Sequence, residues 1–278
     1  MPLKAAPTLG VIRLDYDYPP ACGDIDCPDT YGYDVYYKVV PGLTFEMAQS
    51  GKMTAEVQKR FIESVNWLIN IKKVNVITGD CGFMVYFQEV ALSIQKQQPV
   101  CMVMSSLLQL KSIQATLSPD DEIIVMTANG VALGNMAAAF EKACGFSIVD
   151  PRIKVLGCEN IPGFEAVALG QKVDVAKVQP GMVKLVNDTL KKNPKVKAIL
   201  LECTELPPYA NAIRECSGLP VWDVISACNY VVSAFLNEPR YGKQGWQADW
   251  DKVQDEYVFG QNVKSSNKVY LVNKPAKQ

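Results

Sequence analysis

The sequence contains no histidine in 278 residues. Histidine is the commonest general base in enzymes and a frequent zinc ligand, so its absence excludes a Ser-His-Asp triad and every mechanism that depends on imidazole. Any proton transfer that this chain performs must therefore use another side chain.

Motifs for cofactors and metals are also missing. The chain has no GxGxxG pattern for a dinucleotide and no GxxxxGKS or GxxxxGKT pattern for a nucleotide phosphate. Cys22 and Cys27 are separated by four residues, and no CxxC pair elsewhere completes a four-ligand zinc site. We therefore expect no metal and no cofactor.

Neither sign of charge dominates, because 28 basic residues stand against 29 acidic ones. This balance gives no general attraction to nucleic acid or to an anionic membrane. No run of about 18 apolar residues indicates a membrane-spanning helix, and the first residues do not resemble a signal peptide. Nine cysteines, an odd number, then fit reduced thiols. We expect an intracellular, cytoplasmic protein, with a plastid as the alternative, that binds a small molecule.

Short apolar runs rich in Val and Ile alternate with segments of helical length. Such alternation is typical of an α/β fold, in which parallel sheets are covered by helices. Ligands in these folds bind beyond the carboxyl ends of the strands. Strands are expected at 9–14, 74–78, 100–104, 122–127, 153–157, 197–201 and 221–225, and helices at 54–70, 83–97, 107–116, 131–144, 180–192, 208–217 and 224–236.

Two cysteines follow predicted strands in similar contexts. In VNVITGDCGFM and in KAILLECTELPPY, an apolar run leads into an acid, a cysteine, a small residue and a helix start. The N–H groups of a helix start stabilise a thiolate, so the pKa of Cys81 and Cys203 can fall from about 8.5 toward neutrality. A single cysteine would more simply be a buried packing residue, but the repeated junction favours catalysis. The preceding acids, Asp80 and Glu202, either assist the cysteines or cap helices.

With these two motifs the chain resembles the aspartate/glutamate racemase superfamily, in which each of two lobes supplies one cysteine. Three segments are most similar to the algal dimethylsulfoniopropionate lyases of the Alma family: LGVIRLDYDYPPACGDID, YDVYYKVVPGLTFEMAQSGKMT and ECTELPPYANAIRECSGLPVWD. The resemblance implies two pseudo-symmetric lobes, each a parallel sheet flanked by helices, with the active site in the interlobe cleft. Residues 1–105 with 219–278 are expected in the first lobe and 106–218 in the second, and a homo-oligomer is expected.

The resemblance also implies an activity, that of a carbon-sulfur lyase. Dimethylsulfoniopropionate carries a proton beside its carboxylate and a dimethylsulfonium group on the next carbon, so removing the proton releases dimethyl sulfide and leaves acrylate. Cys81 and Cys203 carry over as catalytic residues, and the sequence does not tell which is the base. One alternative is a cofactor-independent racemase of aspartate or glutamate that uses the same cysteines. A non-enzymatic protein that binds a small carboxylate is another.

The substrate carboxylate requires donors, because the carbanion adds negative charge to it. Candidates are the backbone N–H groups after each cysteine, at Gly82, Phe83 and Glu205, and the Thr204 hydroxyl, which follows the second cysteine where superfamily members bind the carboxylate. Three further hydroxyl residues follow predicted strands and either line the cleft or cap helices, namely Ser105, Ser106 and Thr127.

The sulfonium requires a different environment. Residues 14–54 form a predicted long loop with many tyrosines, and aromatic faces attract cations. Tyr16 and Tyr18, directly after the first predicted strand, are the preferred sulfonium contacts, with Asp15 or Asp17 adding negative charge. The tyrosines could instead stabilise a weakly packed loop.

Overall fold

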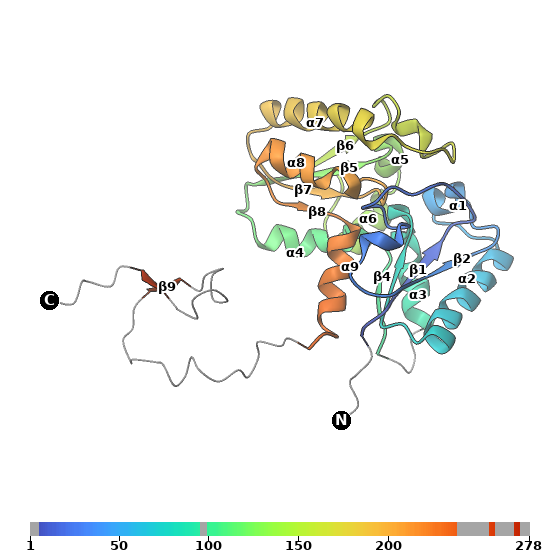
Figure 1. Cartoon of the computed structure of the whole chain (residues 1–278). Helices are drawn as coiled ribbons and strands as arrows, with labels where there is room; N and C mark the ends of the chain where they lie inside the picture. Colours follow the sequence, from blue (N-terminus) through green and yellow to red (C-terminus); the bar gives the residue numbers. More distant parts are fainter. Residues whose placement is uncertain (1–5, 95–98, 238–255, 259–269, 273–278) are drawn as a thin grey trace. The chain divides into compact units, whose positions relative to one another are not determined.

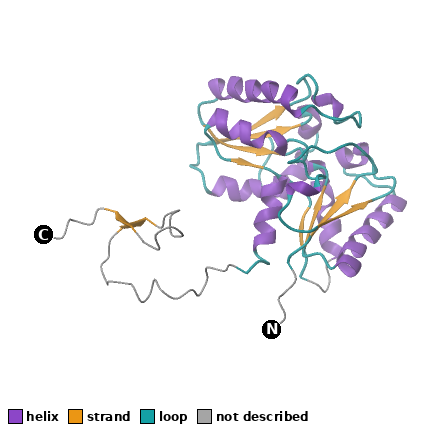
Figure 2. Ribbon diagram, in the orientation of Figure 1, coloured by secondary structure: helices purple, strands orange, loops and turns teal. Residues whose placement is uncertain are grey.

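Two four-stranded parallel sheets form the framework of the protein (Figures 1 and 2). The computed structural model describes residues 6–94, 99–237, 256–258 and 270–272. The strand order is β2-β1-β3-β4 in one sheet and β6-β5-β7-β8 in the other, so both sheets repeat one connectivity. The expected α/β fold, with two parallel sheets flanked by helices, is confirmed.

The first sheet is built from the N-terminal part of the chain. Its strands are β1 Leu9–Arg13, β2 Val35–Val39, β3 Val76–Gly79 and β4 Cys101–Val103. The helices between them are α1 Phe45–Ser50, α2 Ala55–Trp67 and α3 Gln88–Ile94, with the 3-10 segments η1 Pro28–Thr30 and η3 Gly82–Phe87 and the π-helical turn η2 Leu68–Lys72.

The second sheet follows. Its strands are β5 Glu122–Thr127, β6 Ile153–Gly157, β7 Val196–Leu201 and β8 Val221–Trp222. The associated helices are α4 Leu110–Ala115, α5 Gly130–Gly134, α6 Ala137–Cys144, α7 Val175–Lys192, α8 Ala210–Ser217 and α9 Val224–Ser233, with η4 Ser106–Gln109, η5 Phe164–Ala166 and η6 Pro207–Tyr209.

Side chains alternate between the two faces of each sheet, so the two faces of one sheet pack in different apolar clusters. In β1, Leu9 and Val11 pack in a cluster with Val224 and Cys228 of α9, whereas Ile12 belongs to a larger cluster. That larger cluster also contains apolar residues of β5 and β7 from the second sheet. The opposite face of the second sheet packs against α7 and α8. The two sheets therefore share one apolar core.

Three predicted boundaries were wrong, two of them because capping residues outweighed other signals. Helix α7 begins at Val175 and not at residue 180, since Asp174 accepts a hydrogen bond from the Lys177 N–H and Pro180 lies inside the helix. Strand β8 ends at Trp222, because Asp223 forms a capping box and starts α9. The helix predicted at 83–97 begins as the 3-10 segment η3.

The predicted loop at 14–54 also contains regular structure. Strand β2 pairs with β1 at the sheet edge, and α1 is capped by Thr44, which accepts a hydrogen bond from the Met47 N–H. The β2 side chains are only half-buried, which explains why the segment lacks an apolar strand pattern. Cys101, the first residue of β4, is exposed.

Contacts divide the chain into two compact units, residues 1–236 and 237–278. The second unit contains the antiparallel pair β9 Glu256–Val258 and β10 Tyr270–Val272. The rest of the tail after residue 238, predicted to wrap back on the surface, lies outside the described residues.

Strand β8, within the segment 219–278, belongs to the second sheet, and the proposed lobe boundaries stay a prediction. No helix among the described residues is long and apolar enough to cross a membrane.

Candidate active site

The two cysteines occupy equivalent places in the two sheets. Strand β3 and strand β7 are each third in their sheet order, and Cys81 and Cys203 each stand two residues beyond the strand end. Cys81 is the N-cap residue of η3, whereas Cys203 opens a turn closed by a hydrogen bond from the Leu206 N–H to its carbonyl. Each cysteine is 8% exposed.

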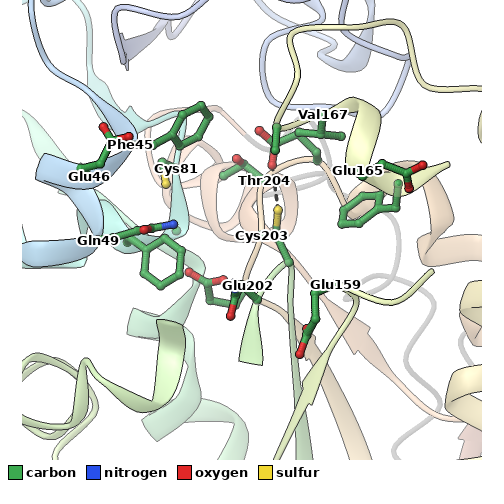
Figure 3. Close-up of a pocket in the computed structure, with 17 residues that line it drawn as sticks. Phe45, Glu46, Gln49, Cys81, Glu159, Glu165, Val167, Glu202, Cys203 and Thr204 are labelled. Carbon is green, nitrogen blue, oxygen red and sulfur yellow. Dashed lines mark hydrogen bonds between the residues drawn. The ribbon is translucent and has the colours of Figure 1, made fainter. Parts of the chain in front are cut away.

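Both cysteines line one cavity of about 400 Å³ (Figure 3). Its walls come from segments that follow β3, β5, β6 and β7, together with one face of α1. These strands belong to both sheets, so residues more than a hundred positions apart in sequence meet here. Figure 3 shows the Cys81 sulfur on the α1 side of the cavity and the Cys203 sulfur on the side of Glu165 and Val167.

The sulfur of Cys203 has an acidic partner. Its thiol donates a hydrogen bond to Glu205 Oε2 across 2.7 Å. Backbone N–H groups also approach both sulfurs two residues further along the chain, from Phe83 toward Cys81 and from Glu205 toward Cys203. The chain therefore has the same local geometry at Cys81 and at Cys203, and the two cysteines differ in that Cys203 has a carboxylate partner.

Burial raises the pKa of both thiols well above the usual value. The negative charges of Glu202 and Glu205 raise them further, and the backbone N–H groups only partly oppose this. The prediction that helix starts lower these pKa values toward neutrality was therefore wrong. Desolvation outweighs the N–H groups because a charged sulfur loses its hydration when it is buried.

Two glutamates of the pocket titrate close to neutral pH. Burial raises the pKa of Glu205 to about 7, although the hydrogen bond from Cys203 opposes the rise. Burial likewise raises the pKa of Glu202 to about 7, against the hydrogen bond that Thr127 Oγ1 donates to its Oε2 across 2.7 Å. Both acids can therefore exchange protons near neutrality, a property typical of catalytic groups.

Glu202 is packed tightly against the other cysteine junction. Its second carboxyl oxygen, Oε1, is buried without a hydrogen-bond partner among the described residues. A Cβ atom at Gly82 would collide with this oxygen and with the Glu202 carbonyl. Gly82 is thus required by close approach of the two junctions, which is a packing role beside its predicted role as a donor.

Hydroxyl groups tie the two junctions together. Thr204 donates a hydrogen bond to the carbonyl of Asp80, the residue before the first cysteine. Ser106 donates to the Leu201 carbonyl across 2.9 Å. Thr204 lines the pocket, and its hydroxyl proton is engaged by the Asp80 carbonyl. Its contact with a substrate carboxylate stays a prediction.

Several predicted contacts do not line the pocket. Ser105 caps η4 by accepting a hydrogen bond from the Leu107 N–H, Ser106 faces β7, and Thr127 reaches the pocket only through Glu202. For Ser105 the capping alternative describes the structure. Thr127 holds a pocket carboxyl in place, a contact that its position at the end of a strand did not indicate.

The predicted sulfonium contacts from the first loop also lie outside the pocket lining. Tyr16 accepts a hydrogen bond from the Gly170 N–H, and its ring packs edge-on against Phe45 with centroids 4.6 Å apart. Tyr18 is buried and donates to Asp24 across 2.8 Å. Asp15 is exposed and accepts from a backbone N–H at residue 42. Tyr16 therefore supports a pocket residue and does not itself form the wall.

The aromatic surface of the pocket is formed by phenylalanines. Phe83 was predicted, whereas Phe45 of α1 and Phe164 of η5 were missed. Neither of these two residues directly follows a strand. The motif YDVYYKVVPGLTFEM, which carries Phe45, was nevertheless among the segments of family resemblance.

The pocket is strongly acidic. Five glutamates line it, and none of its described lining residues is a lysine or an arginine; the glutamates are Glu46, Glu159, Glu165, Glu202 and Glu205. Such a lining attracts a cationic group and disfavours a simple anion. Among the described residues, no group of three or more cysteines and acids is arranged to hold a metal ion.

Comparison with known proteins shows close relatives over nearly the whole chain. The sequence is 47% identical over 272 residues to dimethylsulfoniopropionate lyase 3 of Emiliania huxleyi, a match that covers 96% of this chain and 70% of that protein. It is 41% identical over 262 residues to the dimethylsulfoniopropionate lyase of Durusdinium sp. clade D, covering 94% of this chain and 86% of the relative. No protein-family model matches.

The fold matches solved structures of arylmalonate decarboxylase with TM-scores above 0.5. Unliganded arylmalonate decarboxylase superposes with a TM-score of 0.51 and 16% sequence identity, over 86% of this chain and 97% of that chain. A glutamate racemase from Bacillus anthracis aligns with a TM-score of 0.48 and 13% identity, over 83% of this chain and 81% of that chain.

Proposed function

This chain belongs to the family of dimethylsulfoniopropionate lyases, and we propose that it is a carbon-sulfur lyase that cleaves dimethylsulfoniopropionate into dimethyl sulfide and acrylate. One structural observation supports this most directly. The thiol of Cys203 is hydrogen-bonded to Glu205 at the wall of an acidic, partly aromatic pocket. The pair offers a base without histidine, and the pocket offers an environment suited to a small sulfonium compound.

The reaction that we propose begins at Cys203. Glu205 accepts the thiol proton, and the resulting thiolate removes the proton on the carbon next to the substrate carboxylate. The electrons of that C–H bond form the carbon-carbon double bond of acrylate, and the carbon-sulfur bond breaks with its electrons leaving on dimethyl sulfide. Cys203 then carries the substrate proton and Glu205 the original thiol proton.

Thiolate formation needs a cause, because burial and nearby acids oppose it. A bound sulfonium supplies a positive charge inside the pocket, and opposite charges favour the ionised form of a neighbouring group. The substrate therefore activates its own base, whereas the unliganded thiols stay protonated. This arrangement protects a reactive sulfur between turnovers.

Cys81 faces the same pocket, and no carboxylate among the described residues is hydrogen-bonded to its thiol. We assign it the second role that the superfamily resemblance allows, in which a neutral thiol orients the substrate and donates toward the developing negative charge. The backbone N–H groups of Gly82 and Thr204 are the proposed donors to the substrate carboxylate, because the described lining contains no cationic side chain. The N–H groups of Phe83 and Glu205 already approach the two sulfurs.

Phe45 and Phe164 are the proposed sulfonium contacts, since an aromatic face attracts a cation by its quadrupole. The exposed carboxylates of Glu46, Glu159 and Glu165 add a long-range attraction at the pocket mouth. The same features discriminate against aspartate and glutamate, whose second carboxylate would meet acidic side chains. They therefore favour the lyase over the racemase alternative.

A panel of substrates tests the proposal. Purified protein is incubated with dimethylsulfoniopropionate, and headspace dimethyl sulfide and dissolved acrylate are quantified in parallel. We expect equal amounts of the two products and no inversion of L-aspartate or L-glutamate. Amino-acid inversion without dimethyl sulfide would instead establish the racemase, and neither activity together with ligand binding would establish a binding protein.

We also propose a homo-oligomer in the cytoplasm, with a plastid as the alternative compartment. Light scattering on the purified chain determines its mass in solution. A fluorescent fusion of the full-length protein, expressed in an algal cell, distinguishes the compartments.

A further inference from the structure

The proposed lyase reaction has a consequence that racemisation lacks. Elimination releases one proton in every turnover, so the proton that accumulates on the Cys203 and Glu205 pair must leave before the next substrate is processed. A racemase returns its proton to the product and has no such requirement. The inference below rests on the proposed function and concerns where this proton goes.

A second, smaller cavity lies against Glu205. It measures about 10 Å³ and is lined by Glu205, Asp24, Tyr18 and Tyr209 among others. This volume is close to what the centre of a single water molecule needs, and the wall offers several polar groups. Because Glu205 also lines the large pocket, its carboxyl group stands between the two cavities.

Asp24 is the acid on the far wall of the small cavity. Its side chain is 2% exposed, and its Oδ1 accepts hydrogen bonds from the Tyr18 hydroxyl across 2.8 Å and from the Asp26 N–H across 2.9 Å. No hydrogen bond engages the other oxygen, Oδ2, in the described part of the chain. Asp24 is therefore held rigidly through one oxygen while the other stays available to a water molecule.

The electrostatics support transfer between the two acids. Burial and the negative charge of Glu205 raise the pKa of Asp24 to about 8, close to the value of about 7 for Glu205. Proton transfer between groups of similar pKa costs little free energy. Their mutual repulsion also disfavours the doubly ionised state, so the pair tends to share one proton.

We propose that Asp24 is a proton-relay residue that carries the product proton from Glu205 to solvent through the small cavity. Glu205 donates its proton to a water molecule in this cavity, and that water passes a proton to Asp24, which leaves Glu205 ionised for the next turnover. Asp24 then releases the proton on the side of residues 19–23, where Ala21 is half-buried and Cys22 is exposed. No bond other than O–H bonds forms or breaks.

The competing route is the large pocket itself, because Glu205 faces it and products leave through it. The test separates the two routes by comparing the first turnover with the later ones. Asp24→Asn preserves the acceptor for Tyr18 but cannot carry a proton. Ala21→Leu places a larger side chain in the lining of the small cavity and leaves both carboxyl groups in the chain. Asp29→Asn, an exposed acid nearby that lines neither cavity, is the matched control.

Rapid-quench measurement of dimethyl sulfide gives the first turnover, and headspace assay gives the steady state. For Asp24→Asn and Ala21→Leu we expect a first turnover of one product per site at the wild-type rate, followed by a steady-state rate at least about tenfold lower. Imidazole at increasing concentration should restore the slow phase of Asp24→Asn, since an added buffer can accept the proton directly. Asp29→Asn should match wild type in both phases.

Unchanged steady-state rates in Asp24→Asn and Ala21→Leu would overturn the relay and assign proton release to the substrate pocket. Equal loss in the first and later turnovers, without rescue by imidazole, would show a structural role and would also overturn it. Both outcomes leave the lyase proposal intact, because dimethyl sulfide is still formed by wild type. Absence of dimethyl sulfide from wild type would instead reject the proposed function itself.

Discussion

Glu205 accepts a hydrogen bond from the thiol of Cys203 across 2.7 Å, and no carboxylate partner of this kind bonds to Cys81 among the described residues. The two cysteines otherwise occupy equivalent strand ends in sheets of the same order. A symmetric framework thus carries an asymmetric pair of sulfurs. A racemase needs bases on two faces of a carbon, whereas an elimination needs one, so the asymmetry fits the proposed lyase.

Replacing either cysteine by serine should lower turnover by about a hundredfold or more. At Cys203 a hydroxyl is a much weaker acid than a thiol and does not form the required anion, and at Cys81 the change alters the neutral donor that orients the substrate. Cys203→Ser should show the larger loss, since Cys203 is the proposed base. Headspace dimethyl sulfide measures turnover, and circular dichroism shows that both variants are folded. Cys101→Ser, at an exposed cysteine outside the pocket, is the control and should keep full activity. Full activity in both pocket variants would reject the cysteine mechanism.

Activity should rise as the pH increases through about 7. Glu205 acts as a base only when ionised, and burial raises its pKa from 4.5 to about 7, so its useful form is lost below that pH. Glu205→Gln should lower kcat/KM by about 10² to 10⁴ and remove this limb of the pH profile. Glu215→Gln, an exposed change on α8, should leave the profile unaltered. A profile that stays the same in Glu205→Gln would assign the titration to another group.

Phe45→Leu should weaken binding of the sulfonium more than it affects the chemical step. A desolvated cation over an aromatic ring contributes about 2 kcal/mol, so KM should rise by roughly tenfold or more. The neutral thioether analogue, 3-(methylthio)propionate, separates charge from shape when used as a competitive inhibitor. Its inhibition constant should change little in Phe45→Leu. Equal losses for substrate and analogue would indicate that Phe45 contributes only apolar contact.

Thermal stability should fall as the pH increases from about 5 to 8, partly because of Glu202. Its pKa rises from 4.5 in the unfolded chain to about 7 in the fold, so folding binds a proton within this window. The free energy of unfolding then decreases as the pH rises through it. Glu202→Gln cannot titrate, and its melting temperature should drop by a few degrees less than that of wild type over the same range. Calorimetry at both pH values checks this, and parallel curves would contradict it.

Most of the framework could be predicted from local patterns. The Val- and Ile-rich runs at β1, β3, β5 and β7 indicated buried parallel strands, because strands covered on both faces are apolar along their length. Strand β2 was not predicted, because it lies at a sheet edge and its half-buried side chains give no apolar pattern. The first residues of helix α7 were also missed, because Pro180 indicated a helix start whereas Asp174 caps the helix earlier.

The sequence by itself determined the chemistry available and the positions of its main groups. Without histidine, and with Cys81 and Cys203 each directly following a strand, sulfur was the natural proton carrier, and both features can be read within a few residues. The tertiary structure decided which groups surround the sulfurs. Phe45 and Phe164 line the pocket, whereas Tyr16 does not. Burial in the folded protein also raises the pKa of both thiols. These properties depend on burial and on neighbours distant along the chain, which only the packing of the two sheets creates.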